Sequence, residues 1–477
     1  MSRVLGTEPD SRVRAMMPTR STDLMSNLIA ALLSQAGLIA VTVAYALVIH
    51  LAHSEYLGIR WAYYGFTFDP FSAGDFAFVV ILSMVGAIFL PKTANSPSAV
   101  ILWQLFVIVY VPTITITTAL RPDAFSHYGL ALAGLSFGFA AACRISGSGQ
   151  RAEIAGNHLP SELTDRTLLL VWFISTIVLI FYYRNIISFV SLDNVYVQRM
   201  LTRGQVGQGI AYIQTYYSVV LAPLLFVVGI IKRKYLMIAG GLVGFVLTYG
   251  IDAQKITIAI AVAILIFSQL HKLKTYWRSA AALTAYLLGF ISVLLIIYIS
   301  SDAEWSFTGF QAALDIAVFR MIALPGLTFS QYADLFGERG LTYWSNTRGI
   351  SLLVPPPDAF ANHPDWPHLG RIVGDFYYNS RIVNANANPF SGEGVAAAGP
   401  LGVILIGCLI GAWLRALDWA ARGWDPRFAN LVVIPVGLSL TNGHLATVLL
   451  TFGGAFWIAF FTFARLRLAD TPRKKRY

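Results

Sequence analysis

Residues 279–300 read SAAALTAYLLGFISVLLIIYIS, an apolar run without a charged side chain. A helix of about 20 such residues crosses the hydrocarbon core of a bilayer, because each residue advances the helix by about 1.5 Å. The run therefore predicts a transmembrane helix.

The composition extends this interpretation to the whole chain. Of its 477 residues, 56% are hydrophobic and only 12% are charged, whereas soluble domains carry about 25% charged residues. So few polar side chains cannot cover a soluble globule of this size. The composition excludes a soluble enzyme, a disordered chain and a repeat solenoid, and it indicates an integral membrane protein.

Eleven further apolar runs resemble the first, so the predicted fold class is an all-α polytopic membrane protein with about twelve transmembrane helices (eleven to thirteen). The predicted spans are 27–52, 71–90, 98–120, 128–143, 167–183, 208–231, 235–250, 256–270, 279–300, 394–417, 428–442 and 445–464. A large loop separates the ninth span from the tenth.

The charges of the connecting segments predict the orientation. Twelve spans place both termini on one side, together with 23 of the 34 Lys and Arg and 9 of the 24 Asp and Glu. That side therefore carries a formal charge of +14 and the other side −4. Because basic segments stay in the cytoplasm, both termini are predicted to be cytoplasmic. The basic excess then contacts anionic membrane lipids and not nucleic acid.

Five regions follow from this topology. Residues 1–26 form a cytoplasmic segment, 27–300 hold nine spans, 301–393 form a partly helical periplasmic loop, 394–464 hold three spans, and 465–477 form a basic cytoplasmic tail. Loops of such length inside a compact protein are usually functional.

Several basic residues on the predicted outer side suit an anionic ligand. The planar fork of arginine matches phosphate groups, and the turn from Asp252 to Lys255 lies between two short spans that would draw it below the outer surface. The candidates for binding a pyrophosphate-linked lipid are Arg320, Arg381, Arg199, Arg203 and Lys255. The alternative is that these residues, together with Arg371, only structure their loops, and that Asp252 and Lys255 form an ion pair.

Four outer carboxylates, Asp315, Asp334, Asp375 and Glu393, are candidate general bases. We expect a catalytic role above all for Glu393, which enters the tenth span between two glycines, and for Asp375. The alternative for Glu393 is a helix N-terminal carboxylate stabilised by the helix dipole.

Asn386, Asn388 and Tyr377 have the side chains of a sugar-binding surface, because amides bind hydroxyl groups and aromatic rings cover sugar faces. Aromatic residues also gather at membrane interfaces without any ligand.

No residue pattern indicates a metal or an organic cofactor, and we expect none. His363 and His368 bracket Asp365, but the prolines between them disfavour convergent ligands. The glycines of 204–209 follow no predicted strand, so they do not indicate a nucleotide-binding loop.

Three segments of the chain resemble bacterial oligosaccharide repeat-unit polymerases, the Wzy-type O-antigen polymerases. Residues 249–255 (YGIDAQK) are similar to a basic turn between apolar helices in that family. Residues 319–326 (FRMIALPG) with 332–336 (YADLF) resemble its arginine, proline and aromatic run, and residues 386–403 resemble its asparagine-then-glycine entry into a late span. The family often has a second arginine where this chain has Met321.

The resemblance implies a metal-independent glycosyltransferase at the periplasmic face of the bacterial inner membrane. It would transfer a growing glycan from undecaprenyl pyrophosphate onto the next lipid-linked repeat unit, to build an O-antigen, a capsule or an exopolysaccharide. A flippase and a chain-length regulator are the protein partners that such an enzyme implies.

Three other functions stay open at this point. An O-antigen ligase would share the architecture and the donor. A transporter or flippase would be expected to show internal repeats and charges at the membrane midplane. A membrane O-acyltransferase would need a catalytic histidine, for which His127 and His444 lie at the outer ends of spans.

Overall fold

The computed structural model describes residues 20–147, 156–188, 206–253, 255–300 and 308–469. Within residues 20–25, 255, 308–309 and 465–469 it describes the backbone and not the side chains. Helices make up the regular structure of these parts, which contain two isolated β-bridges and no named strand. The predicted all-α fold class is therefore confirmed.

The helices follow one another with short connections. Up to residue 300 they are α1 (Arg20–Leu33), α2 (Gln35–Ala52), η1 (His53–Leu57), α3 (Gly58–Arg60), η2 (Ala62–Tyr64), α4 (Ala73–Phe89), α5 (Pro97–Leu105), η3 (Phe106–Tyr110), α6 (Val111–Thr118), α7 (Ala124–Ser146), α8 (Glu162–Tyr183), α10 (Gln208–Tyr216), η4 (Tyr217–Leu221), α11 (Ala222–Lys232), α12 (Tyr235–Asp252), α13 (Lys255–Leu270), η5 (Thr275–Arg278) and α14 (Ala280–Ser300). Beyond it they are α15 (Thr308–Leu314), η6 (Asp315–Ala323), α16 (Leu324–Arg339), η7 (Ile350–Leu352), α17 (Asp358–Ala361), α18 (Leu369–Tyr378), η8 (Ser391–Val395), α19 (Ala396–Ala420), α20 (Pro426–Val432), α21 (Ile434–Leu440), α22 (Leu445–Leu450) and α23 (Gly454–Ala469).

Ten helices in the described part of the chain are long and apolar enough to cross a membrane, and three apolar helices are shorter. The protein is therefore a multi-pass membrane protein. Twelve of these thirteen helices coincide with the twelve predicted spans. The thirteenth, Phe310–Arg339, lies inside the region that the sequence predicts to be a periplasmic loop.

Phe310–Arg339 runs across one end of the bundle. Three contacts spaced along it show this: Asp315 accepts a hydrogen bond from Trp61, Gly326 from Thr117, and Asp334 pairs with His127. The three partner residues lie at the outer ends of three different predicted spans. Because all three contacts lie at the same end of the bundle, both termini of the helix Phe310–Arg339 lie at that end. The described residues 308–393 thus form a helical cover over one end of the bundle, the end that the sequence predicts to face outward.

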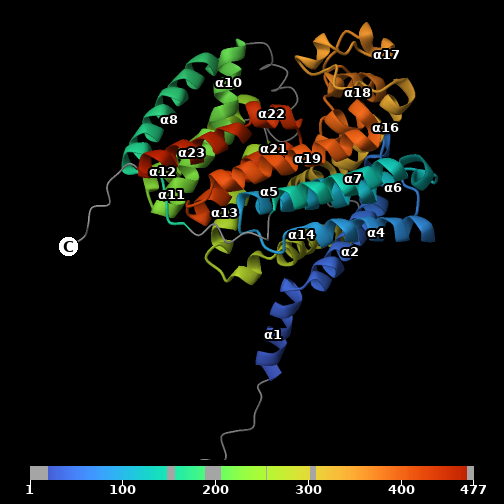
Figure 1. Ribbon diagram of the computed structural model, residues 1–477, viewed down its shortest axis with the longest axis horizontal. Helices are drawn as coiled ribbons and strands as arrows, with labels where there is room; N and C mark the ends of the chain where they lie inside the picture. The colour runs from blue at the N-terminus through green and yellow to red at the C-terminus, as the bar shows by residue number, and fades with distance from the viewer. Residues whose placement is uncertain (1–19, 148–155, 189–205, 254, 301–307, 470–477) are drawn as a thin grey trace, which may run out of the picture.

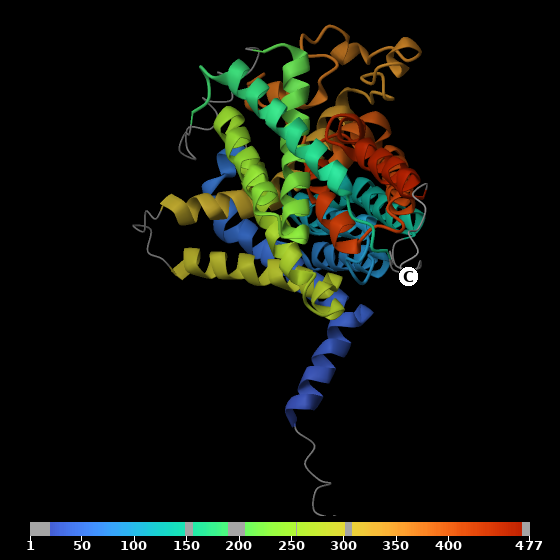
Figure 2. The ribbon, with the colours of Figure 1, turned by 90° about the vertical axis from the view of Figure 1, so that its left-hand side faces the viewer.

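The two ends of the bundle are distinct. Figures 1 and 2 show α1 projecting from one end and the segment with α17 and α18 at the opposite end. Near the end that carries α1, backbone hydrogen bonds join Lys92 to Ala280 and Gly423 to His158. Both bonds connect segments that the sequence places on one side of the membrane, so the predicted alternation of the loops agrees with the structure.

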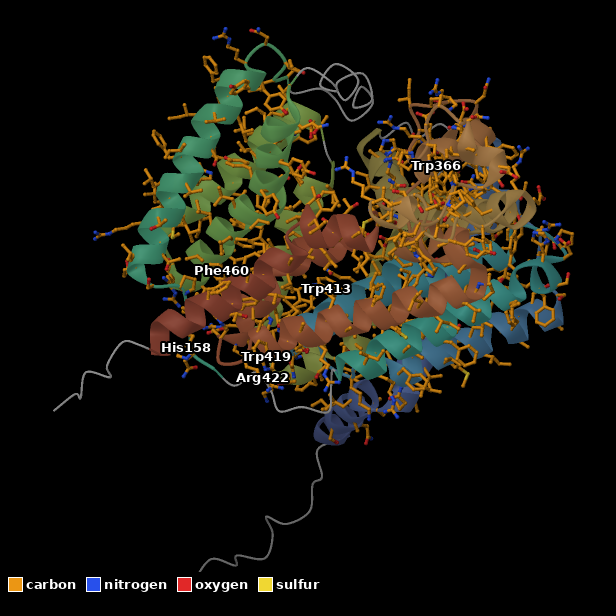
Figure 3. The ribbon with its side chains drawn as sticks, turned by 45° about the horizontal axis from the view of Figure 1, so that its top comes forward. His158, Trp366, Trp413, Trp419, Arg422 and Phe460 are labelled. Carbon is orange, nitrogen blue, oxygen red and sulfur yellow. The ribbon has the colours of Figure 1, made fainter. Side chains whose placement is uncertain are left out.

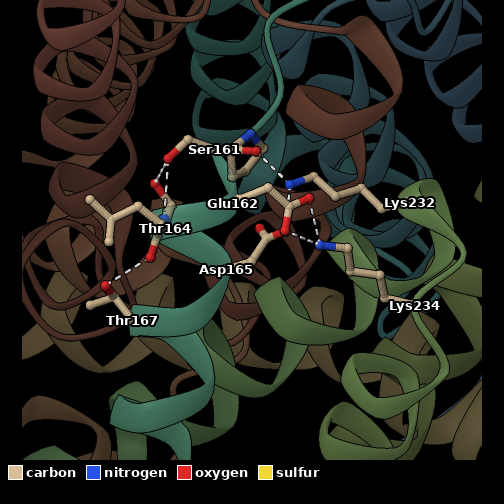
Figure 4. A network of polar contacts seen from close by, with 9 residues as sticks. Ser161, Glu162, Thr164, Asp165, Thr167, Lys232 and Lys234 are labelled. Atoms are coloured by element: carbon tan, nitrogen blue, oxygen red, sulfur yellow. Dashed lines mark hydrogen bonds and ion pairs between the residues drawn. The ribbon is translucent and has the colours of Figure 1, made fainter.

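A buried carboxylate holds this inner end together (Figure 4). Asp165, with a side chain only 3% exposed, accepts hydrogen bonds from Lys232 at 2.6 Å and from Lys234 at 2.9 Å. Lys234 also pairs with Glu162 at 2.8 Å. Burying a carboxylate is costly unless it is paired, and these lysines supply the pairing that fixes α8 against the connection between α11 and α12.

Glycines allow α7 and α19 to pack backbone against backbone in the centre of the bundle. A Cβ atom built on Gly407 of α19 would lie 2.1 Å from the carbonyl oxygen of Gly138 on α7, and one on Gly138 would lie 2.7 Å from the oxygen of Val403. In a bilayer, helices associate through such close packing because lipid supplies no hydrophobic force between them.

We predict that Gly407→Leu separates α7 from α19 and lowers the unfolding temperature in detergent, because overpacking costs about 1–3 kcal/mol or more. The control is Gly289→Leu on α14, where a Cβ would meet nothing within 4 Å. Thermal unfolding of the two purified variants checks this. Equal unfolding temperatures for both would contradict the role of the glycine contact.

Candidate functional site

The outer end of the bundle brings together six residues that are far apart in the sequence. We call them the Arg320 cluster, and its members are Arg60, Trp61, Tyr64, Asp315, Arg320 and Tyr378. They come from the end of the first span, from η6 and from α18. The charged groups of the cluster are its two arginines and its one carboxylate.

The helix type of η6 sets the spacing of its two charged residues. Asp315 and Arg320 are five residues apart in a π-helical segment of nine residues. Because a π-helix bonds residue i to residue i+5, these two positions lie on the same side, one turn apart. Both face the segment 56–66, since Trp61 contacts Asp315 and Tyr64 interacts with Arg320.

Asp315 is held through one of its two carboxylate oxygens. Oδ1 accepts hydrogen bonds from the Tyr56 hydroxyl and, at 3.2 Å, from Trp61 Nε1, and it lies 3.9 Å from Arg60 Nε. The Asp315 side chain is 27% exposed and that of Arg60 is 39% exposed. The carboxylate is therefore fixed in orientation while it stays accessible.

Tyr64 interacts electrostatically with Arg320 and belongs to a group of stacked aromatic rings. Tyr64 stacks on Tyr378 with centroids 4.4 Å apart, and Gln331 Nε2 donates to the Tyr378 hydroxyl at 2.7 Å. Burial raises the pKa of Tyr64, and burial likewise raises the pKa of Tyr378. Both phenols are thus neutral hydrogen-bonding groups, and Tyr64 is the one that interacts with the Arg320 guanidinium.

Trp61 stacks on Phe319 with ring centroids 3.9 Å apart, which positions the first span against η6. This segment is not among the site residues predicted from the sequence. Its signal is the run Arg60-Trp61-Ala62-Tyr63-Tyr64, which directly follows a span and combines a cation with three aromatic rings. We find Tyr63 79% exposed beside Trp61.

Glu393 lies apart from this cluster and caps another helix. Its carboxylate accepts hydrogen bonds from the backbone N–H groups of Leu445 and, at 3.1 Å, of Ala446, which begin α22. Its carbonyl accepts the Trp344 indole N–H at 2.8 Å. Glu393 lies in the first turn of η8, as the alternative to a catalytic role had it, and its carboxylate also caps α22, which the sequence did not predict. The adjacent His444 packs against Gly392.

Arg381 and Asp375 belong to the cap, which we define as residues 340–390. Arg381 Nε donates to Asp365 Oδ2 at 2.6 Å, and Arg371 lies 3.8 Å from Oδ1 of the same carboxylate. Asp375 lies 3.5 Å from His363 Nε2. These pairs hold the polar loop of the cap together. Figure 3 places Trp366 of this cap at the opposite end from His158, Trp419 and Arg422.

The three predicted sugar-binding residues fall into different environments. Asn388 is 2% exposed, and its amide bonds Thr113 at 3.0 Å and the Pro325 carbonyl at 3.2 Å, so it joins helices inside the protein and does not face a ligand. The Tyr377 hydroxyl donates to the Gln331 carbonyl at 3.3 Å. Asn386 is half-buried near Gly370 of α18.

The remaining predicted residues contribute little to a described site. Arg199, Arg203 and the side chain of Lys255 lie outside the described residues. Asp252 accepts a hydrogen bond from Gln214, which in turn accepts the Tyr183 hydroxyl at 2.5 Å. No three His, Cys, Asp or Glu side chains converge as a metal site in the described ranges.

The Asp365–Arg381 pair makes the cap sensitive to acid. The hydrogen bond from Arg381 holds the pKa of Asp365 below its ordinary value. Because the pKa of Asp365 is lower in the folded protein than its ordinary value of 3.8, the ion pair stabilises the cap at pH values above about 3.8. This stabilisation is lost as the pH falls through the folded-state pKa of Asp365.

We therefore predict that Arg381→Gln speeds hydrogen exchange in α18 at pH 6, after correction for intrinsic rates, and that the difference from wild type vanishes as the pH falls below about 4. A difference that persists unchanged at low pH would contradict the ion pair as the cause. Arg348→Gln, a change in the same cap, is the control.

Comparisons of the chain with protein-family models, with curated proteins and with solved structures find no match. The residues and geometry of the chain itself are therefore what supports a functional proposal.

Proposed function

We propose that the protein is a glycosyltransferase of the bacterial inner membrane. It polymerises undecaprenyl-pyrophosphate-linked oligosaccharide repeat units at the periplasmic face, and the product is a surface polysaccharide. The resemblance of residues 249–255, 319–336 and 386–403 to the Wzy-type polymerases supports this, as does the architecture of a helical bundle with a large cover at one end.

The observation that carries the proposal is a cluster with two guanidinium groups, Arg60 beside the Asp315 carboxylate and Arg320 five residues after Asp315 in η6. Breaking a glycosyl pyrophosphate bond leaves negative charge on the departing pyrophosphate, and preorganised guanidinium groups stabilise such charge. The sequence lacks a second arginine beside Arg320, at Met321. Arg60, from the end of the first span, brings a second guanidinium to the same cluster through Asp315.

The location of the cluster supports the periplasmic face. It lies at the end of the bundle opposite α1 and the lysines that pair with Asp165, and the segments that the sequence predicts for that other side carry most of the basic residues. Basic segments stay in the cytoplasm, so both termini would be cytoplasmic and the Arg320 cluster would face the periplasm at the level of the lipid headgroups.

Mass spectrometry of polyprenyl-linked saccharides in a strain without the gene tests the reaction class. Accumulation of single repeat units with loss of long glycan supports a polymerase. Accumulation of full-length polymer on the lipid carrier would identify a ligase instead. Unchanged lipid-linked species with altered acylation of the polymer would overturn the glycosyltransferase proposal in favour of an acyltransferase.

We predict that Arg320→Ala lowers polymerisation by about 10²–10³-fold, the effect of removing one preorganised donor from a developing anion. Arg320→Lys should restore only part of the activity, because lysine keeps the charge and loses the fork. The readout is glycan length on gels, with membrane levels of each variant measured alongside.

The matched control is Arg339→Ala, which removes an arginine that lies over Phe376 near the end of α16. It should leave polymerisation close to wild type. Normal polymerisation by Arg320→Ala would refute the pyrophosphate role of this residue.

A further inference from the structure

We propose that Asp315 is the catalytic base, the group that takes the proton from the attacking sugar hydroxyl. This inference rests on the proposed function, and it assigns to the reaction a residue different from Glu393 and Asp375. Its basis is the position and the hydrogen bonding of the Asp315 carboxylate.

The two oxygens of Asp315 have different surroundings. Tyr56, Trp61 and Arg60 all approach Oδ1. Oδ2 accepts no hydrogen bond and forms no ion pair with any of the described residues. A base needs an orientation fixed by its neighbours and one lone pair open to the substrate. The partly exposed Asp315 meets both requirements.

Asp315 is closer to Arg320 along the helix than Asp334, another carboxylate of this segment. Asp315 lies five residues before Arg320 in the π-helical segment η6, and its Oδ1 lies 3.9 Å from Arg60 Nε, so the carboxylate is close to the guanidinium groups proposed to bind the departing pyrophosphate. Asp334 lies 14 residues beyond Arg320, which is about 20 Å along a helix. A base at that distance cannot serve the bond whose leaving group Arg320 binds.

The other two carboxylates are engaged elsewhere. Glu393 accepts two backbone N–H groups of α22, so that its oxygens serve as a helix cap. Asp375 faces His363 within the cap of residues 340–390. Within the described part of the chain, neither carboxylate pairs with an arginine of the Arg320 cluster, whereas Asp315 lies beside Arg60.

The step balances without any further reactant. The acceptor hydroxyl gives its proton to Asp315 Oδ2 while its oxygen forms a bond to the anomeric carbon of the donor. The bond from that carbon to the pyrophosphate oxygen breaks, and its electron pair stays on the pyrophosphate, where Arg320 and Arg60 stabilise the charge. Asp315 then releases the proton to water.

Azide distinguishes a base from a structural residue, because this anion attacks a sugar carbon without losing a proton. The experiment uses the full-length protein in nanodiscs and the lipid-linked repeat units that accumulate in the strain without the gene. Two products are measured by mass spectrometry, namely the joined repeat units and the glycosyl azide formed in added sodium azide.

We expect Asp315→Asn to lower the joining of repeat units by at least about 100-fold, the usual lower range for loss of a general base. Formation of the glycosyl azide should stay within a few-fold of wild type, because leaving-group stabilisation by the arginines remains. Arg320→Ala should lower both products. Asp123→Asn, an aspartate paired with Arg121 at the same end, is the matched control and should lower neither.

Two results would overturn the assignment. One is near-normal joining by Asp315→Asn, and the other is an equal loss of both products, which marks a structural role. If Asp315→Asn does not fold, Asp315→Glu replaces it, since it keeps a carboxylate at a shifted position. That variant should join repeat units more slowly than wild type at unchanged azide reaction, and equal losses would again refute the base.

If the proposed function itself is wrong, the experiment gives a different result. In that case the wild-type protein forms neither product from the lipid-linked repeat units, and the assignment of Asp315 is overturned together with the reaction. Products formed by wild type but not altered selectively by Asp315→Asn would overturn only the base and leave the glycosyltransferase proposal in place.

Discussion

The close approach of α7 and α19 is the constraint on which the arrangement of the outer end depends. Gly138 and Gly407 let the two backbones meet, and in a bilayer such contact replaces the hydrophobic force that packs soluble proteins. The ends of these helices then lie side by side, so that the start of α7 meets α16 through His127 and Asp334. The segment η8, which leads into α19, packs beside α16. Just before η8, the Asn388 amide donates to Thr113 of α6 and to the Pro325 carbonyl of α16. The cover of the bundle is therefore attached to its most tightly packed pair.

That attachment explains how an apolar bundle presents charged groups at one place. The segment Phe310–Arg339 is apolar enough to cross a membrane, yet its hydrogen bonds to the ends of three other helices keep it across the outer end. Its π-helical part places Asp315 and Arg320 on one side, where the aromatic residues after the first span contact them. A wider helical turn at this point changes which side chains share a face, and such turns often occur at functional sites.

Some residues of the candidate site can be identified from the sequence and others cannot, and the difference has a physical cause. Arg320 could be identified because an arginine among apolar residues is costly and therefore informative. Arg60 and Trp61 were missed, although they follow a span directly, because nothing in the sequence joins them to Asp315 more than 250 residues later. For Glu393 the sequence favoured a catalytic base and offered a helix N-terminal carboxylate as the alternative. The carboxylate lies in the first turn of η8, but it also caps α22, a contact between distant segments that no local pattern shows.

The sequence by itself determined the fold class, the twelve predicted spans and the alternation of basic and acidic loops. These properties depend on the free energy of transferring each segment into lipid, which is a local sum over about 20 residues. Tertiary structure alone decided that Phe310–Arg339 lies across the bundle, that Asn388 is buried and that Asp315 lies beside Arg60. These outcomes depend on contacts between distant segments, whose energies no local pattern contains.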